Sequence, residues 1–143
     1  MRRKLCKWVF IPLGLLFVGI QFIQIDRTNP PVTGEIDAPE AVMAILRRSC
    51  FDCHSNETKW PWYAYVAPTS WLVAKDVRDG RRHMNFSQWS GYNPKQKKHK
   101  REECGEMVEV GVMPLWFYLP LHSEAELSQG DIELIMSWSN GEL

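Results

Sequence analysis

Apolar residues recur at the spacing of one helix face just before the middle of the chain. Val42, Ile45 and Leu46 lie three and four residues apart, as in the buried stripe of an amphipathic helix. Asp37 precedes this stripe and belongs to the residue types favoured as N-caps. We therefore expect a helix that begins at residue 37 or 38 and leads directly into Cys50.

Similar signals predict the other helices of this region. A glycine ends the second helix, and the Ser128 side chain caps the last one, with Asp131 in the capping-box position. The predicted spans are residues 68–80 and 93–110, followed by a helix that opens at Ser128. No strand-type alternation of useful length occurs, so the predicted fold class is all-α with large loops.

An uncharged apolar run at the N-terminus changes this picture. Residues 8–25 contain no charge and only two polar side chains, Gln21 and Gln24. As one helix they would extend about 27 Å, close to the roughly 30 Å of a bilayer interior. Basic residues precede the run, which by the positive-inside rule predicts export of the C-terminal bulk. A cleavable signal peptide is the alternative, although bulky residues follow the run where small ones would be expected.

The domain boundaries follow from this pattern. We expect a membrane anchor over residues 1–27, a polar linker with a proline pair over residues 28–37, and one helical domain over residues 38–143. The predicted location is the bacterial inner membrane, crossed once, with the domain facing the periplasm.

The net charge excludes few classes of protein by itself, because 17 basic and 17 acidic residues balance over 143 residues. Nothing in this balance indicates nucleic acid binding. Residues 95–101 are nearly all basic. They form either a solvated helix face or a docking patch for an acidic partner or anionic lipid.

The candidate chemistry is concentrated in residues 50–54, Cys-Phe-Asp-Cys-His. This C-x-x-C-H pattern is typical of covalent attachment of c-type haem. On a helical turn, positions three and four residues apart share a face. Cys50 and Cys53 can therefore both bond the vinyl groups of one flat ligand, and His54 can bind the iron from the same side.

Three other interpretations use the same residues. A structural zinc site would combine Cys50, Cys53 and His54 with a fourth ligand such as Cys104. A thioredoxin-like redox pair would need a strand and helix context that the pattern lacks. A plain disulfide between Cys50 and Cys53 would close a strained small loop.

Further candidates lie outside the motif. Met113 precedes a proline in the loop after the third predicted helix, and a thioether is a soft ligand suited to low-spin haem iron. The alternative is that Met113 is a core residue. Trp60 and Tyr63 can line a haem edge and donate hydrogen bonds to a propionate, or they can simply fill a core.

These elements in order resemble a class I cytochrome c and, more closely, the bacterial haem-binding domain family. The resemblance spans about two-thirds of the chain. It is carried by residues 50–54, 60–63, 70–73, 85–89, 111–114 and 127–131, with Tyr118 and His122. The resemblance implies one covalent haem c per chain on Cys50 and Cys53, His54 as proximal ligand and Met113 as distal ligand. Cys104 is a departure, since an aliphatic residue is expected there.

The sequence thus predicts a membrane-anchored, periplasmic monohaem c-type cytochrome that transfers single electrons. Its expected partners are the membrane, through the N-terminal helix, and redox proteins. We find no catalytic constellation, so no enzyme activity is expected. The alternative is a haem-based sensor or peroxidase-like protein with an open or labile sixth ligand position.

Overall fold

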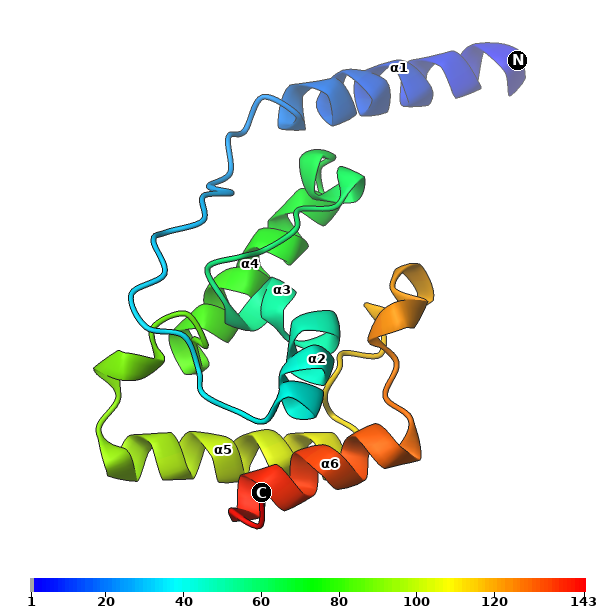
Figure 1. Cartoon of the computed structure of the whole chain (residues 1–143). Helices are drawn as coiled ribbons and strands as arrows, with labels where there is room; N and C mark the ends of the chain where they lie inside the picture. The colour runs from blue at the N-terminus through cyan, green and yellow to red at the C-terminus, as the bar shows by residue number, and fades with distance from the viewer. Residues whose placement is uncertain (1) are drawn as a thin grey trace. The chain divides into compact units, whose positions relative to one another are not determined.

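The structure is a computed structural model that describes the chain from Arg2 to Leu143 (Figure 1). Side chains are described from Trp8 onward. The described residues are mostly helical. The α-helices are α1 (Arg2–Ile20), α2 (Glu40–Ser49), α3 (Phe51–His54), α4 (Thr69–His83), α5 (Pro94–Glu109) and α6 (Gln129–Asn140). Four short 3-10 helices lie at Trp62–Tyr65, Trp89–Gly91, Leu119–Leu121 and Ser123–Ala125.

The chain divides into two compact units. The smaller contains the N-terminal segment up to Thr28 together with Trp60–Asp76. Here the Gln21 amide donates to the Ala67 carbonyl (3.2 Å) and accepts from the Ala67 N–H (2.9 Å). The Arg27 guanidinium donates to the Ala64 carbonyl and lies over the Tyr65 ring. The segment after α1 is thereby tied to the 3-10 turn.

The predicted membrane anchor is wrong. Helix α1 ends at Ile20, five residues before the end of the apolar run. Its uncharged part, from Trp8 to Ile20, has thirteen residues and a length of about 20 Å, well short of a roughly 30 Å hydrocarbon layer. Within the described part of the chain, no helix combines the length and apolarity needed to cross a membrane.

The predicted location depended on that anchor. A single pass through the bacterial inner membrane, with the domain facing the periplasm, is overturned with it. The physical reason is that hydropathy counts apolar residues and does not show where a helix stops. Gln21 leaves the helix to bond the Ala67 backbone, and tighter turns at Gln21, Phe22 and Ile23 finish it.

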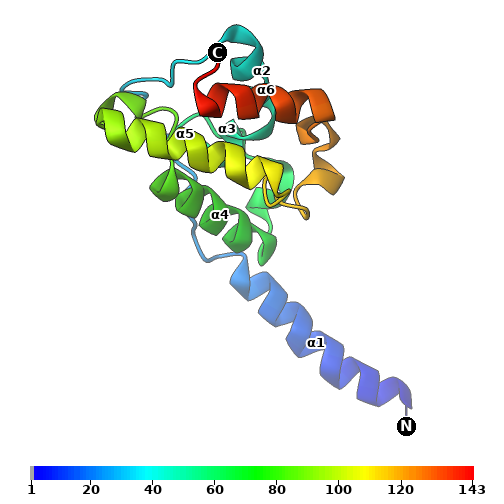
Figure 2. The ribbon, with the colours of Figure 1, turned by 90° about the horizontal axis from the view of Figure 1, so that it is seen from below.

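The larger unit contains Asn29–Lys59 and Val77–Leu143. Helices α5 and α6 pack side by side, and α2 packs against α6 (Figures 1 and 2). Its core is centred on fully buried apolar side chains from two helices and one loop, namely Val42, Leu46, Phe86, Ile135 and Trp138. Residues 33–36 also pair with the loop after α4, through a parallel bridge between Gly34 and Gln88.

Helix ends follow the predicted signals in part. Asn93 and Ser128 cap α5 and α6 through capping boxes, the second with Asp131 as predicted. Helix α2, in contrast, begins at Glu40 after Pro39, with no side-chain cap, so the expected cap at Asp37 is wrong. Helix α4 also passes Gly80 and continues to His83.

Candidate functional site

The predicted helical turn at residues 50–54 is present. Cys50 ends α2 with φ −127° and ψ −32°, and the single turn α3 follows it. The backbone N–H groups of Cys53 (3.2 Å) and His54 (2.9 Å) both donate to the Cys50 carbonyl. Phe51 is buried and stacks on Phe86 with 5.3 Å between ring centroids. The turn is therefore anchored in the core by Phe51, while Cys50, Cys53 and His54 are half-buried.

The His54 imidazole is held in one orientation. Its Nδ1 lies 3.2 Å from the Met84 carbonyl oxygen. Because a carbonyl only accepts, Nδ1 carries the proton and Nε2 keeps its lone pair. Burial lowers the pKa of His54, and the hydrogen bond to Met84 offsets this lowering only in part. A neutral imidazole whose other nitrogen is fixed by a carbonyl is the form in which histidine binds a metal.

Burial keeps two thiols near the turn, Cys50 and Cys104, in the protonated form. Cys50, Cys53 and Cys104 form no disulfide with one another. Burial raises the pKa of Cys50 well above its usual value, and the nearby Cys104 raises it further. Burial also raises the pKa of Cys104 to about 12. Among the described residues, no group of three or more ligating side chains is arranged for a metal ion. The alternative zinc site is therefore not assembled.

Glycine 80 explains how α4 approaches the turn so closely. A Cβ at this position would lie 2.6 Å from the Cys53 carbonyl oxygen and 3.2 Å from the Cys53 Cβ. The first distance is far below van der Waals contact and the second is tight, so any side chain here would force α4 or the turn to shift. The next residue, Arg81, donates to the Ser55 carbonyl (2.7 Å) and to the Thr58 hydroxyl (2.9 Å). The chain that leaves His54 is thus fixed to α4.

A buried polar network supports the same segment. The Asn56 N–H donates to the Ser87 hydroxyl, and the Asn85 amide donates to the Asn56 side-chain oxygen (2.8 Å). The Ser87 N–H in turn donates to the Asn85 side-chain oxygen. Satisfied networks of this kind hold a backbone in one arrangement. The Phe86 N–H adds a bond to the His54 carbonyl (2.7 Å).

The other predicted site residues fall in different places. Trp60 and Tyr63 belong to the smaller unit. The Trp60 indole N–H is buried and makes no hydrogen bond. It is therefore available to donate a hydrogen bond to a carboxylate. Met113 is half-buried in the loop after α5. The roles of these three residues stay predictions.

Sequence reasoning missed several residues that build the site. The Met84 carbonyl, Gly80 and Arg81 all act on the turn from α4 or its end. Asp52 accepts a hydrogen bond from the Tyr118 hydroxyl (2.9 Å), across 66 residues of sequence. A glycine inside a helical pattern was the one available signal, and it was interpreted as a helix end.

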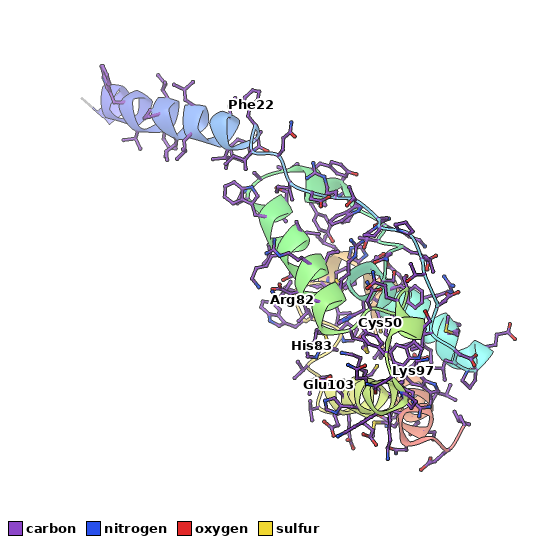
Figure 3. The ribbon with its side chains drawn as sticks, turned by 90° about the vertical axis from the view of Figure 1, so that its left-hand side faces the viewer. Phe22, Cys50, Arg82, His83, Lys97 and Glu103 are labelled. Carbon is purple, nitrogen blue, oxygen red and sulfur yellow. The ribbon has the colours of Figure 1, made fainter. Side chains whose placement is uncertain are left out.

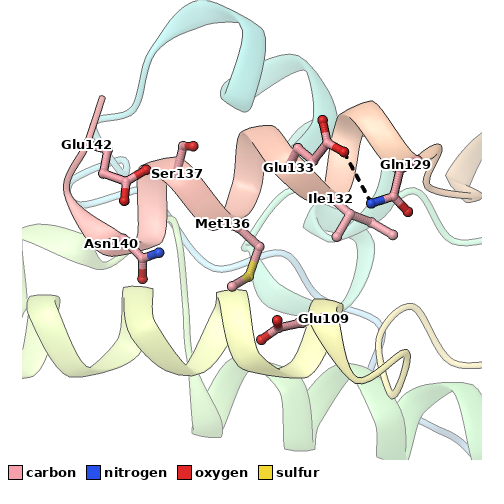
Figure 4. A pocket seen from close by; sticks show the side chains of 8 residues that line it. All are labelled: Glu109, Gln129, Ile132, Glu133, Met136, Ser137, Asn140 and Glu142. Carbon is pink, nitrogen blue, oxygen red and sulfur yellow. Dashed lines mark hydrogen bonds between the residues drawn. The ribbon is translucent and has the colours of Figure 1, made fainter.

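A hollow of about 410 Å³ lies elsewhere, between α5 and α6 (Figure 4). It is lined by Glu109, Gln129, Ile132, Glu133, Met136, Ser137, Asn140 and Glu142. None of them belongs to the turn at residues 50–54. Three carboxylates among eight lining residues also make it a poor receptor for a large apolar ring.

Comparison with known proteins identifies the family of the chain. A family model described as a haem-binding domain matches residues 15–141. The chain therefore belongs to the haem-binding domain family, and haem binding is the function that this membership supports. Searches of curated proteins and of solved structures find no match.

The residues present fit haem. The donor set consists of two thiols three residues apart on one turn and an adjacent imidazole whose Nδ1 is bonded to the Met84 carbonyl and whose pKa is lowered by burial. Soft sulfur and borderline nitrogen donors are those that haem proteins use. Cys50 and Cys53 would hold the porphyrin, and His54 would hold the iron.

Proposed function

We propose that this protein is a monohaem c-type cytochrome whose role is one-electron transfer between protein partners. The observation that supports this most directly is the turn at residues 50–54, where both thiols and a neutral, oriented imidazole come from one short segment. Haem, when bound, supplies an iron that alternates between ferric and ferrous states. No residue is assigned a catalytic role, so the proposal does not include an enzyme activity.

The chain itself contributes positioning and shielding. The Met84 carbonyl keeps the proton of His54 on Nδ1, which leaves Nε2 to bind iron. Gly80 and Arg81 hold the turn against α4, so the imidazole moves little when the charge changes. Phe51 and Phe86 supply an apolar wall beside it. With Met113 as sixth ligand, neither oxidation state would gain or lose a ligand.

Covalent attachment is tested by the pyridine haemochrome spectrum after acid extraction of the purified protein. We expect haem to stay with the wild-type chain and to be extracted from the Cys50→Ser/Cys53→Ser variant. The matched control is Cys104→Ala, which should retain covalent haem. Covalent haem in the double variant would overturn the proposal.

The visible spectrum of the same purified protein distinguishes electron transfer from the alternative sensor or peroxidase-like role. Six-coordinate iron gives a low-spin spectrum in both oxidation states and does not bind carbon monoxide when reduced. High-spin features, or rapid carbon monoxide binding, would favour the alternative.

A further inference from the structure

The segment between α5 and the first 3-10 helix after it is tied at both ends. At one end the Met113 N–H donates to the Met107 carbonyl of α5 (3.1 Å). At the other end the Tyr118 hydroxyl donates to Asp52 Oδ2 (2.9 Å). We call residues 113–118 the strap. It runs from α5 to the turn that contains the two candidate haem-bonding cysteines.

Asp52, the acceptor on that turn, makes two further hydrogen bonds. Asp52 lies between Cys50 and Cys53 in sequence, and its other carboxylate oxygen accepts the Lys59 N–H (2.9 Å). Its backbone carbonyl accepts the Thr58 hydroxyl (2.7 Å). Besides the bond from Tyr118, Asp52 is thus held by one hydrogen bond to its carboxylate and one to its backbone carbonyl, which restrain it if the strap moves. The Tyr118 hydroxyl therefore meets a restrained acceptor.

Apolar burial does not hold the strap. Trp116 is 80% exposed and Phe117 is 40% exposed, so its large side chains gain little from the core. Local contacts shape its end, because the Tyr118 N–H closes a turn on the Leu115 carbonyl and the Tyr118 ring stacks on His122. Neither of these contacts reaches the turn at residues 50–54. The bond from the Tyr118 hydroxyl to Asp52 links the strap directly to that turn.

We propose that Tyr118 is a positioning residue, which fixes the strap and with it the Met113 sulfur relative to the haem-bonding turn. The inference rests on the proposed function, with Met113 as the sixth ligand. Loss of the hydroxyl leaves the ring and its stacking in place but releases the strap from Asp52. Met113 would then leave the iron more often, and an external ligand would bind in its place.

The test is a titration of the oxidised holoprotein with imidazole, followed in the visible spectrum. A bond to a charged group in a partly exposed place corresponds to about a tenfold change in an equilibrium. We expect Tyr118→Phe to bind imidazole about tenfold more tightly than wild type. The weak sulfur-to-iron band of the oxidised protein should decrease in the same variant.

Two controls separate the hydroxyl from general damage. Tyr65→Phe removes the hydroxyl of an exposed tyrosine in the smaller unit and should leave imidazole affinity unchanged. In an Asp52→Ala background, Tyr118→Phe should have no further effect, because the bond is already absent. Equal shifts in both tyrosine variants, or additive shifts with Asp52→Ala, would overturn the inference.

Backbone exchange gives a readout that needs no added ligand. Amide hydrogen exchange at Tyr118, whose N–H bonds Leu115, should accelerate in the Tyr118→Phe holoprotein and stay unchanged in Tyr65→Phe. Haem content, measured on the same samples, separates two kinds of failure. Absence of covalent haem in wild type would refute the proposed function. Intact haem with unchanged imidazole affinity and exchange would refute the role of Tyr118 alone.

Discussion

The chemistry of residues 50–54 depends on atoms outside the motif. His54 is a suitable ligand because the Met84 carbonyl fixes its proton and because burial keeps it neutral. A solvated histidine of ordinary pKa would be partly protonated near pH 6.5 and would exist as two tautomers. The motif therefore supplies the donors, and the fold supplies their protonation state.

Cys104 illustrates the opposite case, a thiol that the fold makes unreactive. It is 7% exposed, and burial raises its pKa to about 12. At pH 8 the thiolate fraction is about 10⁻⁴, against roughly a quarter for an ordinary cysteine. We expect iodoacetamide at pH 8 to leave Cys104 unmodified in the folded protein and to modify it after denaturation, as shown by peptide mass spectrometry. Rapid modification of the native chain would contradict this burial.

Residues of the site were predictable where the chemistry is local in sequence. Cys50, Cys53 and His54 are recognisable as candidates because the proposed attachment to one haem would demand their spacing. The Met84 carbonyl is a backbone atom that any residue type would provide, so no sequence signal marks it. Tyr118 and Asp52 pair across 66 residues, a separation that only the folded chain resolves.

Helix α4 shows that a residue type alone does not decide where a helix ends. Gly80 suggested a helix end, yet the helix continues to His83 because the glycine serves close packing against Cys53. This continuation matters for the site. It places Arg81 beside Ser55 and Thr58, and it brings Met84 to His54. Figure 3 shows His83 near Glu103 of α5, with which it is paired at 2.8 Å.

A substitution at Gly80 tests this packing. In Gly80→Ala the new Cβ would lie 2.6 Å from the Cys53 carbonyl oxygen, so α4 or the turn must shift. We expect a loss of about 1–3 kcal/mol in the free energy of unfolding, measured by urea denaturation. The control is Gly130→Ala in α6, where the Cβ would meet only the Ser128 hydroxyl oxygen, at 3.9 Å. It should be neutral or stabilising by up to about 1 kcal/mol, since alanine favours helices. Equal effects at both glycines would contradict the close contact.

Helix α1 marks the limit of reasoning from composition. Residues 8–25 are apolar enough to suggest an anchor, but the helix stops at Ile20. The stop depends on Gln21, whose amide pairs with the Ala67 backbone, 46 residues away. The positions and caps of α5 and α6 were predictable in contrast, because their signals lie within four residues of each helix start.

At the scale of the whole molecule, basic and acidic residues are equal in number but unevenly distributed along the chain. The chain has a net charge of zero, yet residues 77–101 contain eight basic residues and one acidic residue. Helix α5 has its basic residues in its first half and Glu102, Glu103, Glu106 and Glu109 in its second half. This order opposes the helix dipole, which favours acidic residues at the start. Helix stability therefore does not explain the arrangement.

A segregated charge of this kind creates a local field that net charge does not reveal. Such a field attracts anionic groups and steers oppositely charged molecules, and salt weakens it. We expect the protein, although neutral overall, to bind a sulfonate cation exchanger at pH 7 and low salt. Lys95→Gln/Lys98→Gln should elute at clearly lower salt, because these exposed side chains belong to the basic half of α5.

The control must change net charge equally at another place. Gln129→Glu/Ser137→Asp adds two negative charges in the hollow between α5 and α6, beside Glu133. If the field is local, this control should shift elution much less than the lysine pair does. Identical shifts would show that the exchanger senses only total charge. The basic residues would then be an ordinary solvated helix face, with no part in attracting a redox partner.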